Sequence, residues 1–359
     1  MTVCDHLVVG AGVHGLCTAF WLVQRGAGRV VVCEQFGPGH TRGSSHGATR
    51  ITRSSYDDPT FVAMAQEAHR DCWPALEAAL GRPLRQATPG VFFGPVDGPI
   101  AGYARATLGS GADVEAIDVA AARRRFPLLR FADDDGVLLD HTAAVVLAAA
   151  TLQGLAGWLA AHGVELRWNT PVAALAVDGD GVVATTAAGA IRARTTVLAM
   201  GPWTGRLREA GAGASALAVQ PQDVGYFAAP DASAARPGTF PVWARIGRTA
   251  EDFHYGLPDV GDGLKLAVHR TTGPAIDPDA APTAVDDDAL RQLATIRFAA
   301  PTPRLLRSER CLYTMADGHA LDVRRAVDAP VVTIAACSGH AFKFGPLLGR
   351  RAADLALAH

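Results

Sequence analysis

Three glycines and one acid near the start of the chain have the residue types and the spacing that hold a dinucleotide. Gly10, Gly12 and Gly15 form the pattern Gly-x-Gly-x-x-Gly, and Glu34 lies 19 residues after Gly15. The first glycine allows a tight turn, the second lets the backbone approach a pyrophosphate, and the third lets a helix pack closely on a strand. An acid at that distance accepts hydrogen bonds from the adenosine ribose, which favours NAD or FAD over a 2′-phosphorylated nucleotide.

A second group of reactive side chains follows closely. His46, Arg50 and Arg53 lie in a glycine- and serine-rich segment, residues 40–53, where an ordinary loop would need no such cluster. Arginine presents a planar fork of donors that can bind a carboxylate through two parallel hydrogen bonds. Lys265 and Lys343 add two candidate cations much later in a chain where lysine is scarce.

The flanking segments supply the elements that the glycine pattern requires. Residues 7–9 are a short apolar run, residues 16–25 are amphipathic, and residues 30–32 are a second apolar run before Glu34. Strand, glycine turn, helix and strand in this order predict a Rossmann-type unit. The alternative is a glycine-rich turn without a ligand, which the terminal acid disfavours.

The rest of the chain predicts a cofactor domain interrupted by two excursions. Helices are expected at residues 61–80 (broken near Pro74), 145–162 and 346–358, and strands at 164–168, 173–177, 182–186, 191–200 and 331–336. We therefore expect an α/β (α+β) fold with a Rossmann-type FAD-binding domain at residues 1–84, 143–215 and 318–359. Residues 85–142 and 216–317 would form an inserted substrate domain on a mostly antiparallel sheet. Such a split cofactor domain is more typical of FAD proteins than of NAD enzymes.

The composition excludes several classes of protein. The 359 residues are 49% hydrophobic and 19% charged with a net charge of −2, which indicates a packed globular protein and no basic surface for nucleic acid or membranes. No apolar run is long enough to span a membrane, and a strand at residue 7 is taken to leave no room for a signal peptide. The six cysteines show no metal-ligand spacing. A cytoplasmic location is expected, with no metal.

Six motifs in register carry a family resemblance. They are residues 10–15, "HTRGSSHGATRITR" (40–53), "AMGPW" (199–203), "YGLPDVGDGLKLAVH" (255–269), "CLYT" (311–314) and "SGHAFKF" (338–344). Together they resemble monomeric sarcosine oxidase, pipecolate oxidase and N-methyltryptophan oxidase. The resemblance implies a flavoprotein of the D-amino-acid-oxidase type that acts as a monomer. It would oxidise a secondary or N-substituted amino acid to an imine and pass the electrons to O2, giving H2O2.

The resemblance also implies roles for individual residues. Arg53 and Lys343 would bind the substrate carboxylate, and Tyr255 and Tyr313 would form the wall of the substrate pocket. Lys265 would promote oxygen reduction, because a fixed cation stabilises the developing superoxide. The catalytic set that we expect from this is Lys265, His269, Arg50, His46 and Tyr255.

The cofactor site would draw on residues from the whole chain. Cys311 would attach FAD covalently through a thioether, and Arg50 beside the flavin ring would raise its reduction potential. The expected contacts are Gly10, Gly12, Val13, His14, Gly15, Glu34, Gln35, Arg42, Gly43, Ser44, His46, Thr49, Arg50, Val172, Gly201, Trp203, Cys311, Gly339, His340, Phe342 and Lys343.

Departures from the family pattern leave the substrate open. Ala341 occupies a position where relatives have glycine, and Cys337 precedes the "SGH" motif. We therefore expect a specialised substrate, such as a cyclic imino acid or a bulky N-substituted amino acid. A same-fold dehydrogenase with another electron acceptor is the alternative, and a non-catalytic flavin-binding protein is a further one.

Overall fold

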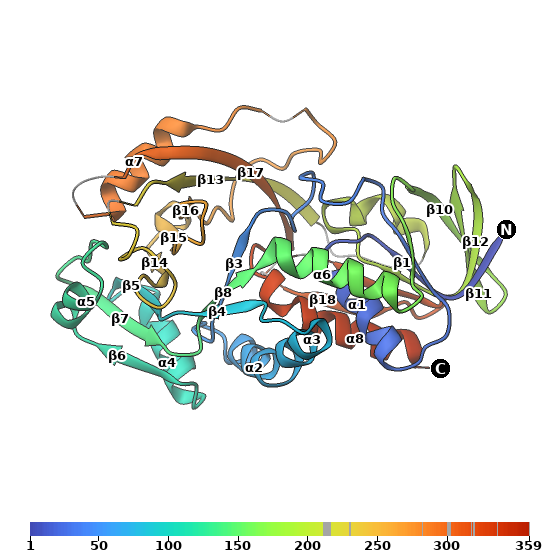
Figure 1. Ribbon diagram of the computed structural model, residues 1–359, viewed down its shortest axis with the longest axis horizontal. Helices are drawn as coiled ribbons and strands as arrows, with labels where there is room; N and C mark the ends of the chain where they lie inside the picture. Colours follow the sequence, from blue (N-terminus) through green and yellow to red (C-terminus); the bar gives the residue numbers. More distant parts are fainter. Residues whose placement is uncertain are drawn as a thin grey trace.

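The computed structural model describes residues 1–210, 217–229, 231–281, 283–299, 303–316, 318, 320–335 and 337–358. Strands and helices alternate through the first part of the chain, and two large β-sheets lie at opposite ends of the molecule (Figure 1). The α/β class with a mostly antiparallel second sheet agrees with the prediction. The domain borders expected at residues 215–216 and at residue 317 lie outside the described residues.

The first sheet is built around β1 (Thr2–Val9). This strand pairs in parallel with β2 (Val30–Cys33) and with β12 (Gly189–Leu198), and the parallel set is extended by β9 (Glu165–Arg167) and β19 (Val331–Ala335). Antiparallel strands complete it: β11 (Gly181–Thr186) pairs with β12, β10 (Val172–Asp178) pairs with β11, and β18 (Asp322–Arg325) pairs with β19. The predicted strands of this sheet are confirmed to within a few residues.

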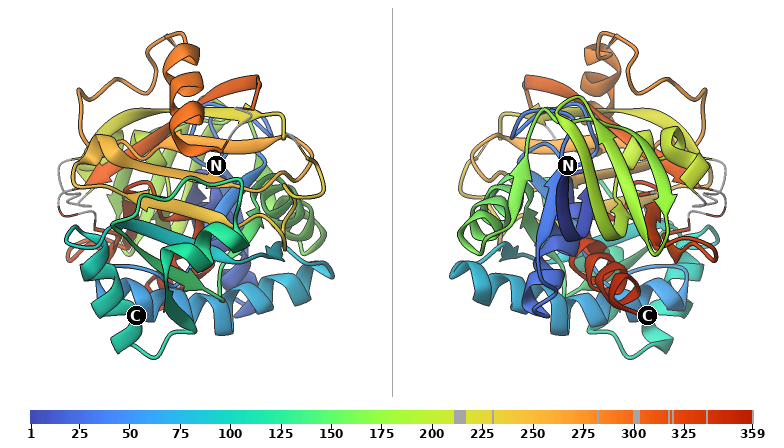
Figure 2. Two further views of the ribbon diagram at one scale, coloured as in Figure 1. Left: turned by 90° about the vertical axis from the view of Figure 1, so that its left-hand side faces the viewer. Right: turned by 90° about the vertical axis from the view of Figure 1, so that its right-hand side faces the viewer.

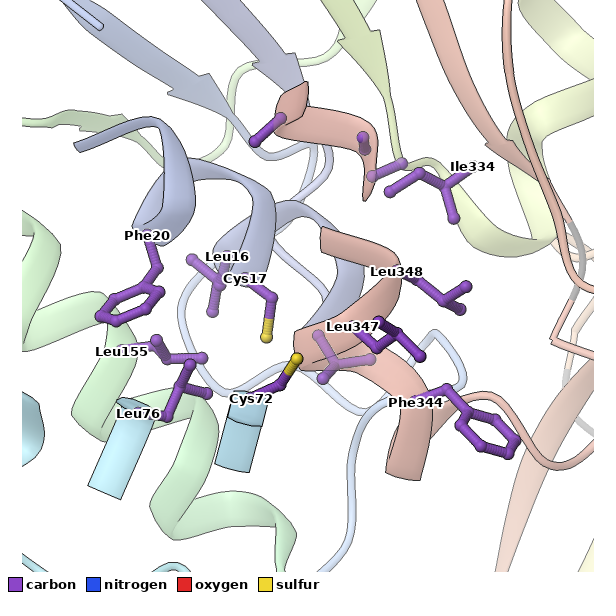
Figure 3. Close-up of a cluster of buried hydrophobic side chains, with 14 of the residues drawn as sticks. Leu16, Cys17, Phe20, Cys72, Leu76, Leu155, Ile334, Phe344, Leu347 and Leu348 are labelled. Carbon is purple, nitrogen blue, oxygen red and sulfur yellow. The ribbon is translucent and has the colours of Figure 1, made fainter. Parts of the chain in front are cut away.

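Helices cover the first sheet with an apolar core. α1 (Val13–Gln24) packs against α8 (Gly345–Leu357) and α6 (Ala148–Ala161). Figure 3 shows how Leu16 and Phe20 of α1 face Leu155 of α6, while Leu347 and Leu348 of α8 close the same cluster. α1 and α8 lie far apart in the sequence but pack together, and this packing brings the C-terminal segment beside the glycine turn.

The second sheet has eight strands in the order β17-β13-β16-β15-β14-β5-β7-β6. Only the β14–β5 pair is parallel. Its strands are β5 (Gly90–Pro95), β6 (Val114–Ile117), β7 (Asp135–Asp140), β13 (Leu217–Phe227), β14 (Val242–Ile246), β15 (Phe253–Leu257), β16 (Leu264–Val268) and β17 (Leu305–Ala316). Helix α7 (Asp287–Arg297) packs on it through Leu290 and Leu293, and Figure 2 shows this helix on the outer side. The helices α4 (Ile100–Gly109) and α5 (Val119–Arg125) connect β5 to β6 and β6 to β7.

A third, small sheet lies between the two large ones and corrects one prediction. Residues 145–147 were expected to begin a long helix, but they belong to β8 (Ala144–Leu147), which pairs with β3 (Thr49–Thr52) and β4 (Arg85–Ala87). The consecutive β-branched residues Val145 and Val146 favour a strand, and the alanine-rich helix starts only at Ala148. Residues 49–52, which include Arg50, therefore form a paired strand, while residues 40–48 before them are a loop.

The helix expected at residues 61–80 is divided, as Pro74 suggested. α2 (Pro59–Glu67) continues into a π-helical turn (Ala68–Cys72) and then into α3 (Trp73–Leu80), which ends at Gly81. The irregularity lies in the turn before Pro74, where a proline lacks the N–H needed for a regular α-helical ladder. Within the described ranges, no helix is both long and apolar enough to cross a membrane.

Candidate active site

A cavity of about 890 Å3 contains most of the residues singled out above. Its walls come from the ends of β1 and β2, from α1, from the β3 segment, from β13–β17 of the second sheet, and from residues 337–343. This size is typical of a site for a cofactor or small ligand. All predicted site residues line it except Gly15 and Arg42; Arg42 lies over the ring of Phe36 instead.

The glycine turn has the geometry that its spacing predicts. Gly10 has a φ of +103°, and a Cβ there would overlap the carbonyl of Ala199. A Cβ on Gly15 would overlap the carbonyl oxygen of Gly10, so this glycine serves the close packing of α1 on β1. Glu34 is buried at the end of β2 and accepts hydrogen bonds from the N–H groups of Ala11 (2.8 Å) and Phe36 (3.0 Å).

Arg50 holds the backbone of the residues that precede it, 44–49. Its guanidinium donates to three carbonyls, those of Ser44 (2.9 Å) and His46 (2.6 Å) in the loop before β3 and that of Thr49 (2.8 Å) in β3 itself. It also lies 3.9 Å from the sulfur of Cys311. The arginine therefore fixes the backbone of the loop and places a permanent positive charge beside the cysteine.

Cys311 lies on β17 at the wall of the cavity, 9% exposed. Its thiol is 3.7 Å from the carbonyl oxygen of Ser44. His46 lies in the same loop, and burial together with the charge of Arg50 lowers the pKa of its imidazole to about 4. The imidazole of His46 is therefore neutral at physiological pH.

Arg53 and Lys343 are both buried in the cavity wall, 8% and 7% exposed. We call this pair the carboxylate clamp, after the role that the family resemblance predicts for it. The guanidinium of Arg53 donates to the carbonyl of Ser55 and lies between the rings of Tyr56, Phe92 and Tyr103, at 4.2, 4.9 and 5.6 Å from their centroids. The Nζ atom of Lys343 donates to the carbonyl of His340 (3.0 Å). Burial and then the charge of Arg53 hold the pKa of Lys343 well below its usual range, as expected for two cations that face one pocket.

Lys265, on β16, is 4% exposed and donates to the carbonyl of Thr49 at 3.2 Å. Burial and then the nearby Arg50 lower the pKa of its ammonium group to about 7. The chain contains only two lysines, Lys265 and Lys343, beside 31 arginines (33 − 2). Both lysines lie in this cavity, where a lysine can change its protonation state and an arginine cannot.

His269 lies one residue past the end of β16, which stops at Val268. It was expected to project from the strand on the same side as Lys265, and both side chains do line the cavity. The Nδ1 atom of His269 is 3.3 Å from the hydroxyl of Tyr313, and Tyr313 is hydrogen-bonded to Tyr255. These three side chains form one hydrogen-bonded wall.

Some lining residues were not anticipated from the sequence. The aromatic residues Tyr56, Phe92 and Tyr103 around Arg53 look like ordinary core residues when they are read singly. Glu309 lines the cavity and accepts from the hydroxyl of Tyr226 at 2.5 Å. It lies two residues before Cys311 on β17, so the period of two along a strand could have indicated it.

Two features of the cavity suit a flavin dinucleotide: the glycine turn, and buried polar atoms that have no hydrogen-bond partner in the protein. Among the described residues, His14 Nε2, His46 Nε2 and Thr314 Oγ1 are buried in its wall without a hydrogen-bond partner. Buried polar atoms of this kind normally have partners, so they call for a polar ligand. They are spread over the first turn of α1, the loop before β3 and β17, so a single ligand that meets all three would be as extended as FAD is.

Fold and cavity together define the class, a flavin-binding oxidoreductase. Comparison with known proteins then gives the family: the model of DAO, FAD dependent oxidoreductase, matches residues 5–355, and the chain belongs to this family. The monomeric sarcosine oxidase of Streptomyces avermitilis is 32% identical, with 98% of this chain and 93% of that protein covered. The peroxisomal sarcosine oxidase of Mus musculus is 30% identical, over 98% of this chain and 92% of that protein.

A solved structure is also similar over the whole length. It is the open form of NikD, an unusual amino acid oxidase essential for nikkomycin biosynthesis, with 28% identity and a TM-score of 0.87 over 99% of this chain and 94% of that one. The chain is therefore an FAD-dependent oxidoreductase of the sarcosine and N-methyl amino acid oxidase type.

Proposed function

We propose that this enzyme oxidises the C–N bond of a secondary, cyclic or N-substituted amino acid to an imine, with O2 as electron acceptor and H2O2 as product. The observation that carries the proposal is the position of the two lysines and Arg53, which are buried in the cavity that holds the glycine turn. Bound FAD would supply the two-electron acceptor. The residues of the chain would bind, orient and tune.

The carboxylate clamp gives the substrate its orientation. Arg53 offers a fork for a bidentate carboxylate contact and Lys343 adds a second donor, whose charged form a bound carboxylate would favour, in surroundings of low dielectric that strengthen both interactions. A substrate held at its carboxylate would have its amine directed along the wall of His269, Tyr255 and Tyr313. Fixed orientation of this kind can supply a large part of the rate acceleration.

Lys265 and Arg50 would stabilise negative charge that develops on oxygen and on the flavin, and would not bind the substrate. Lys265 is the cation that would stabilise superoxide character during oxygen reduction, and its buried position favours oxygen over a bulky electron acceptor. Arg50 would raise the flavin potential, since a fixed positive charge favours the reduced, more negative flavin. Cys311, held beside Arg50, is the proposed point of covalent attachment.

The substrate class is the least defined part of the proposal. The aromatic residues around Arg53 and the buried Ala341 narrow the pocket beside the clamp, which favours a flat or cyclic amino acid. The sarcosine oxidases are at least as similar in sequence as NikD, so the narrowed pocket, and not the comparisons, carries the preference for a specialised substrate. We further propose that the enzyme is monomeric and cytoplasmic. It would have one FAD domain and one substrate domain, divided as the two large sheets suggest.

An anaerobic substrate panel tests the proposal. Flavin absorbance is followed after the addition of glycine derivatives, proline, pipecolate and larger N-alkyl amino acids, and air is then admitted. Bleaching by a secondary amino acid with peroxide formation in air supports an oxidase. Bleaching without peroxide indicates a dehydrogenase, and no bleaching by any member contradicts catalysis on this class. Acid precipitation of wild type and Cys311→Ser shows whether the yellow colour stays with the protein.

A further inference from the structure

A buried carboxylate lies behind the clamp. Asp140, the last residue of β7 in the second sheet, is 0% exposed and is not among the residues that line the cavity. Its two oxygens accept five hydrogen bonds: from Ser54 N (2.8 Å), Ser55 N (2.9 Å) and Ser55 Oγ (2.9 Å) on Oδ2, and from Thr142 N (2.9 Å) and Thr142 Oγ1 (2.6 Å) on Oδ1. A carboxylate only accepts, so this donor set suits it fully.

These bonds fix the turn that carries Arg53. Ser54 and Ser55 follow Arg53 directly, and their successive N–H groups converge on one oxygen of Asp140. The carbonyl of Ser55 in turn accepts from Arg53 Nη1. The hydroxyls of Ser54 and Thr142 are 2.7 Å apart and add a second link. Asp140 is thus linked to the guanidinium of Arg53 through one short turn, which is fixed by the N–H groups of Ser54 and Ser55 and by the hydroxyl pair.

We propose that Asp140 is the positioning residue of the carboxylate clamp, which holds the turn at residues 53–55 so that Arg53 faces the cavity. This inference rests on the proposed function, because it assumes that Arg53 binds a carboxylate. A buried charge is costly unless it is fully hydrogen-bonded, and a charged side chain here fixes the geometry of two backbone N–H groups that no apolar residue could hold. The carboxylate also attracts Arg53 and so partly balances the two cations of the clamp.

The test uses the flavin-loaded enzyme and the variant Asp140→Asn. An amide cannot accept all five bonds, because its NH2 group would face at least one backbone N–H. The probes are pyrrole-2-carboxylate and its primary amide, two non-oxidisable rings of the same shape, of which only the first carries the charged, acceptor-only group; both are titrated by the change in flavin absorbance. We expect the variant to bind the carboxylate about tenfold more weakly or worse and the amide within about twofold of wild type. The thermal midpoint and the flavin content are measured beside each titration.

Matched variants separate positioning from a general structural role. Asp135→Asn changes the buried aspartate at the other end of the same strand, which accepts from Ala132 N and is not part of the cavity wall, and it should leave both affinities unchanged. If Asp140→Asn fails to fold, Thr142→Val removes one donor to Asp140 and should weaken only carboxylate binding, to a smaller degree. Equal loss for both probes, or no loss in Asp140→Asn or the folded Thr142→Val, overturns the inference.

The variant Arg53→Met distinguishes this inference from the proposed function. If that variant keeps full affinity for the carboxylate, the clamp itself is wrong. If Arg53→Met loses the carboxylate while Asp140→Asn keeps it, the clamp stands and only the role of Asp140 fails.

Discussion

Arg50 and Arg53 are three residues apart, but they have different roles because their surroundings differ. Arg50 is committed to the carbonyls of Ser44, His46 and Thr49, so its donors organise the loop and its charge acts on whatever lies beside Cys311. Arg53 instead lies among three aromatic rings. Aromatic walls exclude water, and a guanidinium in such a place gains more from a carboxylate than one on the surface does.

The residue whose charge should change near neutral pH is Lys265. Its pKa is lowered to about 7. The side chain therefore carries a positive charge below pH 7 and loses that charge as the pH rises above 7. If the charge promotes oxygen reduction, flavin reoxidation should be fast at pH 6 and should slow by about tenfold per unit well above pH 7. Stopped-flow mixing of photoreduced enzyme with O2 measures this rate, and Lys265→Met should be slow and flat across the same range.

The presence of only two lysines gives this prediction a direct control. Protein labelled with 13Cε-lysine should give two NMR resonances, which Lys343→Arg assigns. The resonance of Lys265 should titrate near pH 7, well below an exposed lysine. A Lys265 resonance that titrates above pH 10 would contradict the lowered pKa and the predicted pH dependence. A reoxidation rate in Lys265→Met equal to wild type would remove Lys265 from the oxygen site.

At the scale of elements, the sequence predicted those parts of the fold that have a local signal. The β1–α1–β2 unit could be predicted because its glycines, its apolar runs and Glu34 are close together in the chain. Strand β8 could not, since Val145 and Val146 become a strand only by pairing with β3 and β4, which lie some 60 to 100 residues earlier. For the same reason, the family motifs indicated Arg53, while Asp140 and the three aromatic rings are recognised only once the second sheet is placed beside β3.

Two helix glycines should respond in opposite ways to the same substitution. In α1, Gly15→Ala puts a methyl group onto the carbonyl of Gly10 and should destabilise the protein by about 1–3 kcal/mol and reduce flavin content. In α6, Gly157 has open space where a Cβ would lie, so Gly157→Ala should stabilise by about 0.5–1 kcal/mol through helix propensity alone. Urea unfolding and the ratio of flavin to protein absorbance measure both, and a harmless Gly15→Ala would contradict the packing described for the glycine turn.

For the whole molecule, the cavity depends on segments that only the folded chain brings together. Gly10 follows β1 of the first sheet, Arg53 follows the small third sheet, Cys311 lies on the second sheet, and Lys343 precedes the last helix. No partly folded piece of the chain contains the full set of contacts. A ligand of this cavity therefore binds the native state and not the unfolded chain, and must stabilise the native state as a whole.

This coupling can be measured in a variant whose flavin can be removed. In Cys311→Ser, FAD should be releasable, and adding it back at a hundredfold excess over Kd should raise the free energy of unfolding by about 2.7 kcal/mol. Cys4→Ser is the matched control, because Cys4 is buried in the first sheet away from the cavity and should keep the wild-type mode of flavin binding. Because the chain has six tryptophans, unfolding is followed by 19F NMR of fluorotryptophan-labelled protein, with the signals of Trp158, near α1, and Trp243, in the second sheet, assigned by Trp→Phe variants. If the cavity joins the two sheets through the cofactor, FAD should shift both signals together; a shift confined to Trp158 would mean that FAD stabilises the first sheet alone.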